Sequence, residues 1–424
     1  MSRFFRILVD ARTLSLIGLA ALAGFLFFGA SALEVALGYA GIALGLFVLI
    51  LGLVWAFKKI QAYRASQALE SAMDESAALE EKLAPSKNRA DVSLLRTRMQ
   101  DAVNTIKQSK LGLTTGRSAL YELPWYMVIG NPAAGKSTAV VKSGLKFPFA
   151  DNTGNIIQGI GGTRNCDWFF TSEGILLDTA GRYSVHEEDR QEWMGFLSLL
   201  KKHRPKAPIN GIIIAVSLSE IAEAKPQACI QLAKSLRQRV QELTESLEVF
   251  APVYLVFTKA DLISGFTEFF AEYRDRECEK VWGATLPYDP ESHTDAVSLF
   301  DKHFECLRDG LKEELLANMT LHRGRTLPPG VLSFPLEFAA LKPALQSFIA
   351  TLFEENPYQF RPIFRGFYFT SALHEGVVSS SASNSVVQQF NLQTADITVK
   401  TTETSYGYFL KDLFSKVIFA DKEL

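Results

Sequence analysis

The eight residues Gly130–Ser137 constrain the fold of this chain more than any other part of its 424 residues. They read G-N-P-A-A-G-K-S, which matches the phosphate-loop pattern G-x-x-x-x-G-K-[ST]. The apolar run Tyr126–Ile129 comes before the loop, and a helix is expected over Thr138–Gly144. Because the backbone N–H groups of such a loop and the positive end of the next helix converge on one point, the pattern predicts a strand, a phosphate site and a helix.

Two side chains of this loop carry charge or a metal-binding oxygen. The Lys136 ammonium is expected to contact β- and γ-phosphate oxygens, and the Ser137 hydroxyl is expected to join a Mg²⁺ shell. The predicted phosphate-binding residues are Gly130, Asn131, Ala133, Ala134, Gly135, Lys136, Ser137, Thr138 and Gly181.

A second motif follows at the expected distance along the chain. The apolar runs Asp167–Phe170 and Ile175–Leu177 flank a Ser-Glu-Gly turn, which is typical of a β-hairpin. The second run leads into D-T-A-G at Asp178–Gly181, where a P-loop protein places its acidic Mg²⁺ partner. Thr163, before the hairpin, is a candidate for the first switch residue. The expected Mg²⁺ ligands, with GTP or ATP as nucleotide, are Ser137, Thr163 and Asp178.

Two further buried strands are expected, and the second ends in a base-recognition motif. Gly211–Val216 and Val253–Phe257 are almost continuously apolar, as parallel strands covered on both faces are. The sequence T-K-A-D then matches the [NT]-K-x-D element of GTPases, so Thr258, Lys259 and Asp261 are the predicted base-binding residues. A carboxylate there accepts from two guanine N–H groups, a pair that adenine does not present. The alternative is a polar turn after a strand.

The last base-contacting loop of a GTPase is not found where it is expected. Leu332–Phe338 is apolar enough to be the final strand, but Ala339–Lys342 follows it with no S-A-K tripeptide. The choice between GTP and ATP therefore stays open.

Catalysis is equally open, because Arg182 stands after the D-x-x-G glycine, where fast GTPases often have a glutamine. The catalytic candidates are Arg182, His186 and Glu187, and the alternative is a solvated switch loop. We therefore expect any GTP or ATP hydrolysis to be slow.

The N-terminal residues predict a membrane anchor. Residues 13–33 and 35–57 contain no charged side chain and are separated by Glu34, and ~20 apolar residues suffice to cross a bilayer as a helix. A cleaved signal peptide and a buried hairpin of a soluble core are the alternatives, but two such spans in succession fit neither well. Residues 1–59 are therefore predicted to form a transmembrane hairpin with cytoplasmic ends. The flanking cations that set this orientation are Arg3, Arg6, Arg12, Lys58, Lys59 and Arg64.

The remaining chain divides by composition. Residues 60–118 are charged and helix-prone, which predicts a helical stalk. Residues 119–355 are predicted to form an α/β P-loop domain of the GTPase-like type, with a mostly parallel sheet and a helical insertion at about 262–330. Residues 356–424 are expected to be a C-terminal cytoplasmic extension. The net charge of −2 does not suggest nucleic acid as a partner, and the isolated cysteines argue against a zinc site or a disulfide framework.

These motifs together resemble the N-terminal part of the IcmF/TssM family, inner-membrane subunits of bacterial type VI secretion systems. The resemblance rests on the hairpin, on YELPWYMVIGNPAAGKST, LLDTAGRY and VYLVFTKADLI, and on FRGFYFTSALHEG and FLKDLFSKVIFADKEL near the end. It implies a location in the bacterial inner membrane with most of this chain in the cytoplasm. The implied partners are other membrane-complex subunits, cytoplasmic baseplate proteins and further copies of the same chain. Family members continue into a further span and a periplasmic domain, so we expect a truncated or shortened member.

Two functions compete at this stage. In the first, a membrane-anchored nucleotide-binding subunit couples its NTPase-like domain to assembly or docking of the secretion machine. In the second, the chain is a structural membrane scaffold in which nucleotide is bound without turnover or is not bound. An intact P-loop favours the first, and the missing glutamine favours the second.

Overall fold

The computed structural model describes part of residues 45–60 and most of the chain from residue 123 onward. Two compact units are separated at Met1–Gln67 and Ala68–Leu424. The described ranges after residue 60 are 123–147, 166–179, 181, 190–204, 207–271, 273, 275–288, 295–321, 327–356, 358–372, 376–377, 398–399 and 407–422.

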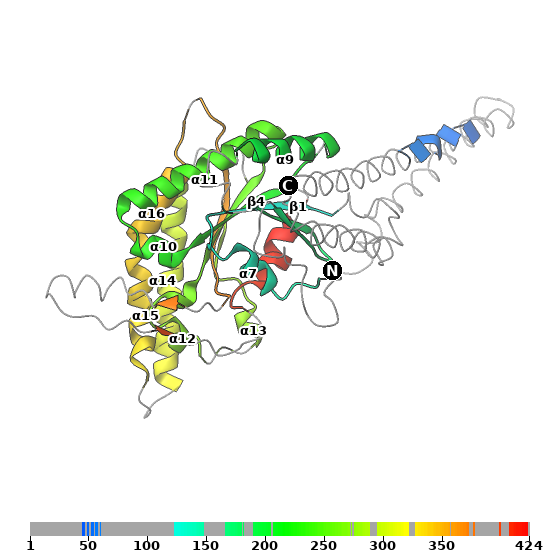
Figure 1. Cartoon of the computed structure of the whole chain (residues 1–424). Helices are drawn as coiled ribbons and strands as arrows, with labels where there is room; N and C mark the ends of the chain where they lie inside the picture. The colour runs from blue at the N-terminus through cyan, green and yellow to red at the C-terminus, as the bar shows by residue number, and fades with distance from the viewer. Residues whose placement is uncertain are drawn as a thin grey trace, which may run out of the picture. The chain divides into compact units, whose positions relative to one another are not determined.

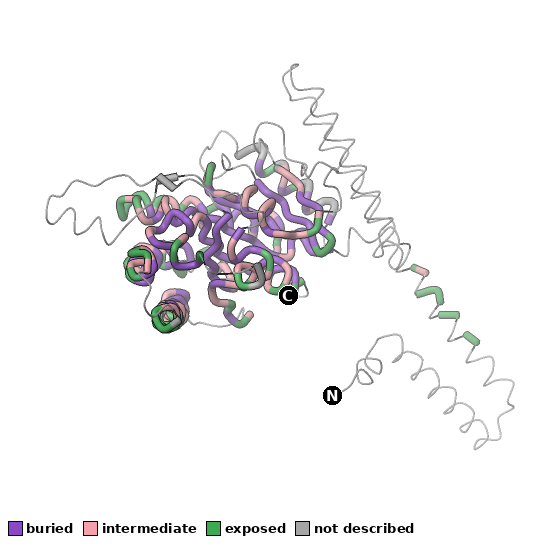
Figure 2. The backbone as a smooth tube through the Cα atoms, turned by 90° about the horizontal axis from the view of Figure 1, so that it is seen from below, coloured by how far each residue is buried: buried purple, intermediate pink, exposed green. Residues whose placement is uncertain are grey.

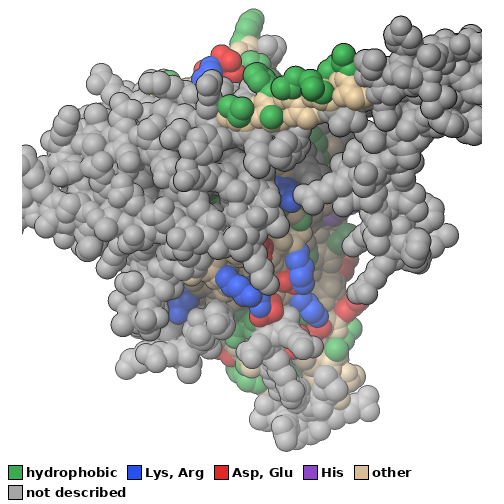
Figure 3. All heavy atoms as spheres, turned by 90° about the vertical axis from the view of Figure 1, so that its right-hand side faces the viewer, with side chains coloured by type: hydrophobic (Ala, Val, Ile, Leu, Met, Phe, Trp, Pro, Cys, Tyr) green, Lys and Arg blue, Asp and Glu red, His purple; other side chains and the backbone are tan. Residues whose placement is uncertain are grey.

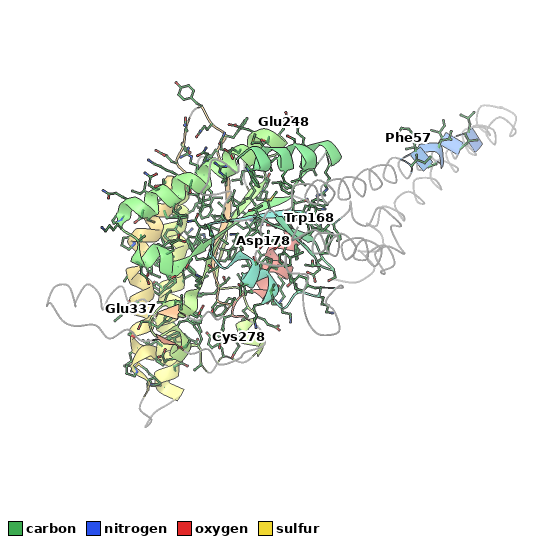
Figure 4. All side chains as sticks on the ribbon, in the orientation of Figure 1. Phe57, Trp168, Asp178, Glu248, Cys278 and Glu337 are labelled. Carbon is green, nitrogen blue, oxygen red and sulfur yellow. The ribbon has the colours of Figure 1, made fainter. Side chains whose placement is uncertain are left out.

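The first unit is described only between residues 45 and 60, where the described positions are helical and their large apolar side chains are exposed. Phe57, labelled in Figure 4, is 69% exposed. The other exposed apolar side chains are Leu46, Leu49, Ile50, Leu53, Val54 and Ile60. Within the described residues, no helix combines the length and the apolar character needed to cross a bilayer. The span predicted at 13–33 lies outside the described residues, and that at 35–57 is described only in part.

The second unit is built on a seven-stranded sheet with the order β2-β3-β1-β4-β5-β7-β6. Strands β3, β1, β4, β5 and β7 run parallel, and β2 and β6 pair antiparallel at the two edges. The predicted α/β fold with a mostly parallel sheet is thus confirmed. The strands are β1 Trp125–Ile129, β2 Cys166–Phe170, β3 Ile175–Thr179, β4 Gly211–Ser217, β5 Pro252–Thr258, β6 Gly283–Thr285 and β7 Ile363–Phe369.

Alternate residues of each strand point to opposite faces of the sheet, and helices pack against the apolar side chains of one face. Met127, Ile214, Leu255 and Phe369 belong to the large core on this face. Figures 1 and 2 show the helices packed against the sheet and the buried residues between them. The helices that pack there are α9 Arg190–His203, α10 Leu218–Glu223, α11 Pro226–Leu247, α12 Phe266–Phe269, α14 Ala296–Leu321, α15 Pro329–Ala340 and α16 Lys342–Leu352. Near α12, Asp275–Cys278 forms the short helix α13.

The opposite face is covered by helix α7, Lys136–Val141, and by the chain's last described residues. We call residues Gly407–Lys422 the C-terminal segment; it contains a π-helical turn, Leu413–Ile418, and a 3₁₀ turn, Phe419–Asp421. Its buried side chains pack against alternate residues of the central strands, among them Tyr126 and Tyr254. This second layer completes a three-layer α/β domain.

Buried phenols tie the C-terminal segment to the sheet. Tyr254 Oη donates to Asp421 Oδ2 at 2.7 Å, and Tyr126 Oη donates to the Ile418 carbonyl. Arg365 of β7 reaches both Asp421 oxygens, at 2.7 and 3.0 Å. Burial, together with the hydrogen bond to Asp421, raises the pKa of Tyr254 above its ordinary value, so the phenol remains a donor. The segment is therefore fixed to both β5 and β7.

The prediction that Leu332–Phe338 is the final strand is wrong, because these residues lie within α15. Val331, Phe334 and Phe338 are all buried, and their spacing of three and four residues is that of one helix face. The last parallel strand is β7, which lies beyond residue 355.

The sheet does not end at the boundary that we expected between residues 119–355 and 356–424. The extension supplies both β7 and the C-terminal segment. The expected helical insertion at 262–330 contains α12, α13 and all of α14, but also the edge strand β6. Among the residues expected to form the stalk, 60–118, only Ile60 is described.

Candidate nucleotide site

The predicted phosphate loop connects β1 to α7, as its sequence pattern requires. Gly135 and Ala133 adopt left-handed backbone conformations, with φ of 78° and 59°. At Gly130 an added Cβ would lie 2.2 Å from the Ala215 carbonyl oxygen of β4, so only glycine fits. The loop therefore curls tightly at the carboxyl end of β1, and α7 begins at Lys136. Such a curl turns successive backbone N–H groups toward a common anion site.

Lys136 lies inside this loop and is only 7% exposed. Its ammonium donates to the Gly130 and Asn131 carbonyls, both at 2.8 Å. Burial lowers the pKa of Lys136, and the nearby Asp178 and Glu220 carboxylates oppose that shift. The cation is thus held against the loop that is predicted to bind phosphate.

Ser137 and Asp178, two of the three predicted Mg²⁺ ligands, lie in direct contact. The Ser137 hydroxyl donates to Asp178 Oδ2. Asp178 pairs in register with Val128 across the neighbouring strands β3 and β1, and is fully buried beside α7 (Figure 4). The third, Thr163, lies outside the described residues.

The chemistry of these donors fits Mg²⁺, which takes oxygen ligands and is commonly held by one or two side chains plus phosphate and water. A hydroxyl and a buried carboxylate oxygen in contact supply that set. Within the described ranges, no three His, Cys, Asp or Glu side chains gather into a metal-binding group. A site completed by phosphate oxygens does not require such a group.

Gly181 brings the D-T-A-G motif against the phosphate loop. A Cβ at Gly181 would lie 2.2 Å from the Pro132 nitrogen and 2.6 Å from the Asn131 carbonyl carbon, so glycine alone permits this approach. The catalytic candidates Arg182, His186 and Glu187 lie outside the described residues.

The predicted base-recognition motif is joined to the phosphate loop by a buried hydrogen bond. Thr258, at the end of β5, is 1% exposed, and its hydroxyl donates to the Ala134 carbonyl at 2.6 Å. Lys259 follows in a left-handed conformation with φ 58°, which turns the chain. Asp261 comes next but one and is 4% exposed. The structure therefore brings the phosphate-loop and base-motif residues together at the carboxyl ends of the parallel strands.

Ser371 is a site residue that the sequence analysis missed. Its hydroxyl donates to Asp261 Oδ1, and the serine is fully buried. It follows β7 directly, in the sequence Thr370-Ser371-Ala372. We expected the S-A-K tripeptide after Leu332–Phe338, which is not the final strand. The signal that identifies Ser371 is the S-A pair that directly follows the strand-like residues Phe364–Thr370.

A parallel sheet with a phosphate loop after a central strand, an acidic residue on the adjacent strand and T-K-A-D after β5 defines a P-loop α/β domain. The family model described as the IcmF-related N-terminal domain matches residues 186–424, which is more than half of the chain. The chain therefore belongs to the IcmF-related family, as the resemblance of its motifs implied.

A curated relative, the type VI secretion system component TssM1 of Pseudomonas aeruginosa strain PAO1, is 40% identical over 340 residues. The match covers 79% of this chain but 31% of that protein, so this chain spans about a third of its relative's length.

Three solved structures of GTP-binding proteins are similar only at low scores. The signal recognition particle receptor SRβ-GTP/SRX complex of Chaetomium thermophilum has 17% identity and a TM-score of 0.24, covering 34% of this chain and 75% of that one. An ADP-ribosylation factor-like GTP-binding protein/SAR1 of Encephalitozoon cuniculi in complex with GDP has 16% identity and a TM-score of 0.22, and the match covers 41% of this chain and 60% of that one. A GTP-binding protein of Sulfolobus solfataricus in complex with GDP has 13% identity and a TM-score of 0.20, and the match covers 45% of this chain and 50% of that one.

We predict that Thr258→Val lowers the free energy of unfolding by about 1–3 kcal/mol, because it leaves the buried Ala134 carbonyl without this donor. Urea unfolding of the full chain in detergent, followed by tryptophan fluorescence, measures the change. The matched control is Thr320→Val on α14, whose hydroxyl donates to backbone carbonyls on an exposed helix surface. Equal effects of the two substitutions would contradict the structural role assigned to Thr258.

Proposed function

We propose that this chain is a membrane-anchored, guanine-nucleotide-binding subunit of a type VI secretion membrane complex in the bacterial inner membrane. It couples nucleotide occupancy of its cytoplasmic P-loop domain to assembly or docking of the secretion machine. Its partners are other membrane-complex subunits, cytoplasmic baseplate proteins and further copies of itself. Membership of the IcmF-related family and the similarity to a type VI secretion component support the secretion assignment.

The observation that carries the nucleotide proposal is the convergence of cation, hydroxyl and carboxylate at one loop. Lys136 supplies positive charge within the loop, and the Ser137 hydroxyl contacts Asp178. Gly181 lies against the same loop backbone. Ser137 and Asp178, with Thr163, would hold Mg²⁺, which neutralises charge between the β- and γ-phosphate oxygens. A purely structural scaffold has no use for a cation and an acid placed in this way.

The choice of guanine over adenine rests on Asp261. Its carboxylate is buried, and the Ser371 hydroxyl bonded to Oδ1 restricts its orientation. A carboxylate oriented in this way can accept from two neighbouring N–H donors, which guanine has and adenine lacks.

We predict that the full chain with Mg²⁺ binds GTP at least about 100-fold more tightly than ATP, because Asp261 recognises guanine. Asp261→Ala removes that preference. Lys136→Ala weakens the binding of both GTP and ATP, because the lysine contacts only the phosphates. Fluorescence titration with labelled nucleotides measures each affinity. Lys416→Ala is the control, because Lys416 is exposed and pairs with Asp412 at 2.6 Å. On the face shown in Figure 3, basic and acidic side chains lie beside one another in the same way. If neither nucleotide binds, the scaffold function is favoured instead.

The membrane anchor is supported by the exposed apolar side chains between Leu46 and Ile60 and by the uncharged runs at 13–33 and 35–57. We predict that the full chain stays with the membrane fraction after alkaline carbonate extraction, because two apolar spans hold it in the bilayer. A variant lacking residues 1–59 should move to the soluble fraction. Release of the full chain by carbonate would show that the anchor is peripheral.

A secretion assay in cells distinguishes the nucleotide-binding function from the scaffold alternative. We predict that Lys136→Ala lowers secretion at least about 10-fold with normal protein level and normal complex assembly, because a nucleotide-dependent step fails. Secretion is measured by release of a secreted component into the medium, with Lys416→Ala as the matched lysine control. Secretion at the wild-type rate from Lys136→Ala would favour the scaffold.

A further inference from the structure

Ser371, the residue that donates to Asp261, is held by the C-terminal segment. The Ser371 N–H donates to the Tyr408 carbonyl at 3.1 Å, and the Tyr408 N–H donates to the Ser371 carbonyl at 2.7 Å. This reciprocal pair is an isolated antiparallel bridge. Ser371 is fully buried, so these bonds fix the backbone from which its hydroxyl reaches Asp261. The position of the base-recognition carboxylate therefore depends on Tyr408.

The residue before Tyr408 contacts both halves of the candidate site. The Gly407 N–H donates at 3.1 Å to the carbonyl of Lys142, which follows the P-loop helix α7. A Cβ at Gly407 would lie 2.5 Å from the Ser371 carbonyl oxygen and 3.1 Å from Ala372 Cα. Gly407 thus fits closely between the loop after β7 and the end of α7, with no room for a side chain.

The rest of the C-terminal segment holds this contact in place. The Phe409 N–H donates to the Cys278 carbonyl at 2.5 Å, and Lys411 pairs with Glu279. Leu410 and Leu413 are fully buried against the sheet. A displacement of the segment therefore draws Tyr408 away from Ser371, and Asp261 loses the hydroxyl that orients it.

We propose that residues Gly407–Leu410 control how tightly guanine nucleotide is held, by positioning Ser371 against Asp261. This inference rests on the proposed guanine-nucleotide site and adds a regulatory element to it. Because coupling between two sites is reciprocal, bound guanine also strengthens the contact between Ser371 and Tyr408. A force or partner that displaces the C-terminal segment then speeds guanine-nucleotide release without touching the phosphate loop.

The test is Gly407→Ala in the full chain, in detergent with Mg²⁺, because the added methyl group pushes the segment from Ser371. We expect GDP affinity to fall roughly 10- to 100-fold, the effect of losing a buried hydrogen bond to a charged group, with faster release of labelled GDP. Affinity for ADP, which uses the phosphate contacts alone, should stay unchanged. A domain that is merely destabilised would lose affinity for both GDP and ADP. The matched control is Gly310→Ala on α14, where nothing lies within 4 Å of the added Cβ.

A second measurement uses the unaltered chain. GDP should slow hydrogen exchange at the Tyr408 amide, whose N–H donates to Ser371, whereas ADP should not. Unchanged GDP affinity in Gly407→Ala, or equal losses for GDP and ADP, would overturn the coupling while leaving the proposed nucleotide site intact. Identical exchange at Tyr408 with GDP and with ADP would also overturn the coupling alone. Absence of GDP binding to the unaltered chain would overturn both proposals.

Discussion

The carboxyl ends of parallel strands all lie at the same end of the sheet, and the whole candidate site depends on that arrangement. β1 ends in the phosphate loop, β3 ends beside Asp178, and β5 ends at Thr258. The hydroxyl of Thr258 then spans β4 to reach the loop carbonyl of Ala134. That hydrogen bond links the phosphate and base halves directly, and the Gly407 N–H that donates to the Lys142 carbonyl adds a second link outside the sheet.

The sheet remains in this arrangement because polar groups on its second face find partners in the C-terminal segment. A phenol buried under an apolar layer costs free energy unless its hydroxyl is hydrogen-bonded. Tyr126 and Tyr254 meet this requirement through the Ile418 carbonyl and Asp421, so residues distant in sequence complete the core around β1 and β5. Arg365 adds a two-point contact from β7 to the same carboxylate. The segment is thus part of the P-loop domain and not an appendage to it.

The sequence predicted the central strands because continuous apolar runs such as Gly211–Val216 have few alternatives as buried parallel strands. It failed at Leu332–Phe338, where the apolar density fits a strand and a buried helix equally, and tertiary packing of Phe334 and Phe338 decides for the helix. Ser371 was lost through the same error, since the search for its motif began after the wrong segment. Its contact with Asp261 joins residues 110 positions apart, which no local pattern encodes.

The charges around the loop explain why the proposal pairs the nucleotide with a divalent cation. Lys136 is one buried ammonium, and Asp178 is a fully buried carboxylate beside Ser137. A polyphosphate entering this loop gains from the lysine but approaches a fixed negative charge in a medium of low effective dielectric, where repulsion is strong. A divalent cation held by Asp178 would turn that repulsion into two attractions. Under the proposed function, a carboxylate at this position would therefore favour a phosphate ligand that arrives with Mg²⁺ and disfavour one that arrives alone.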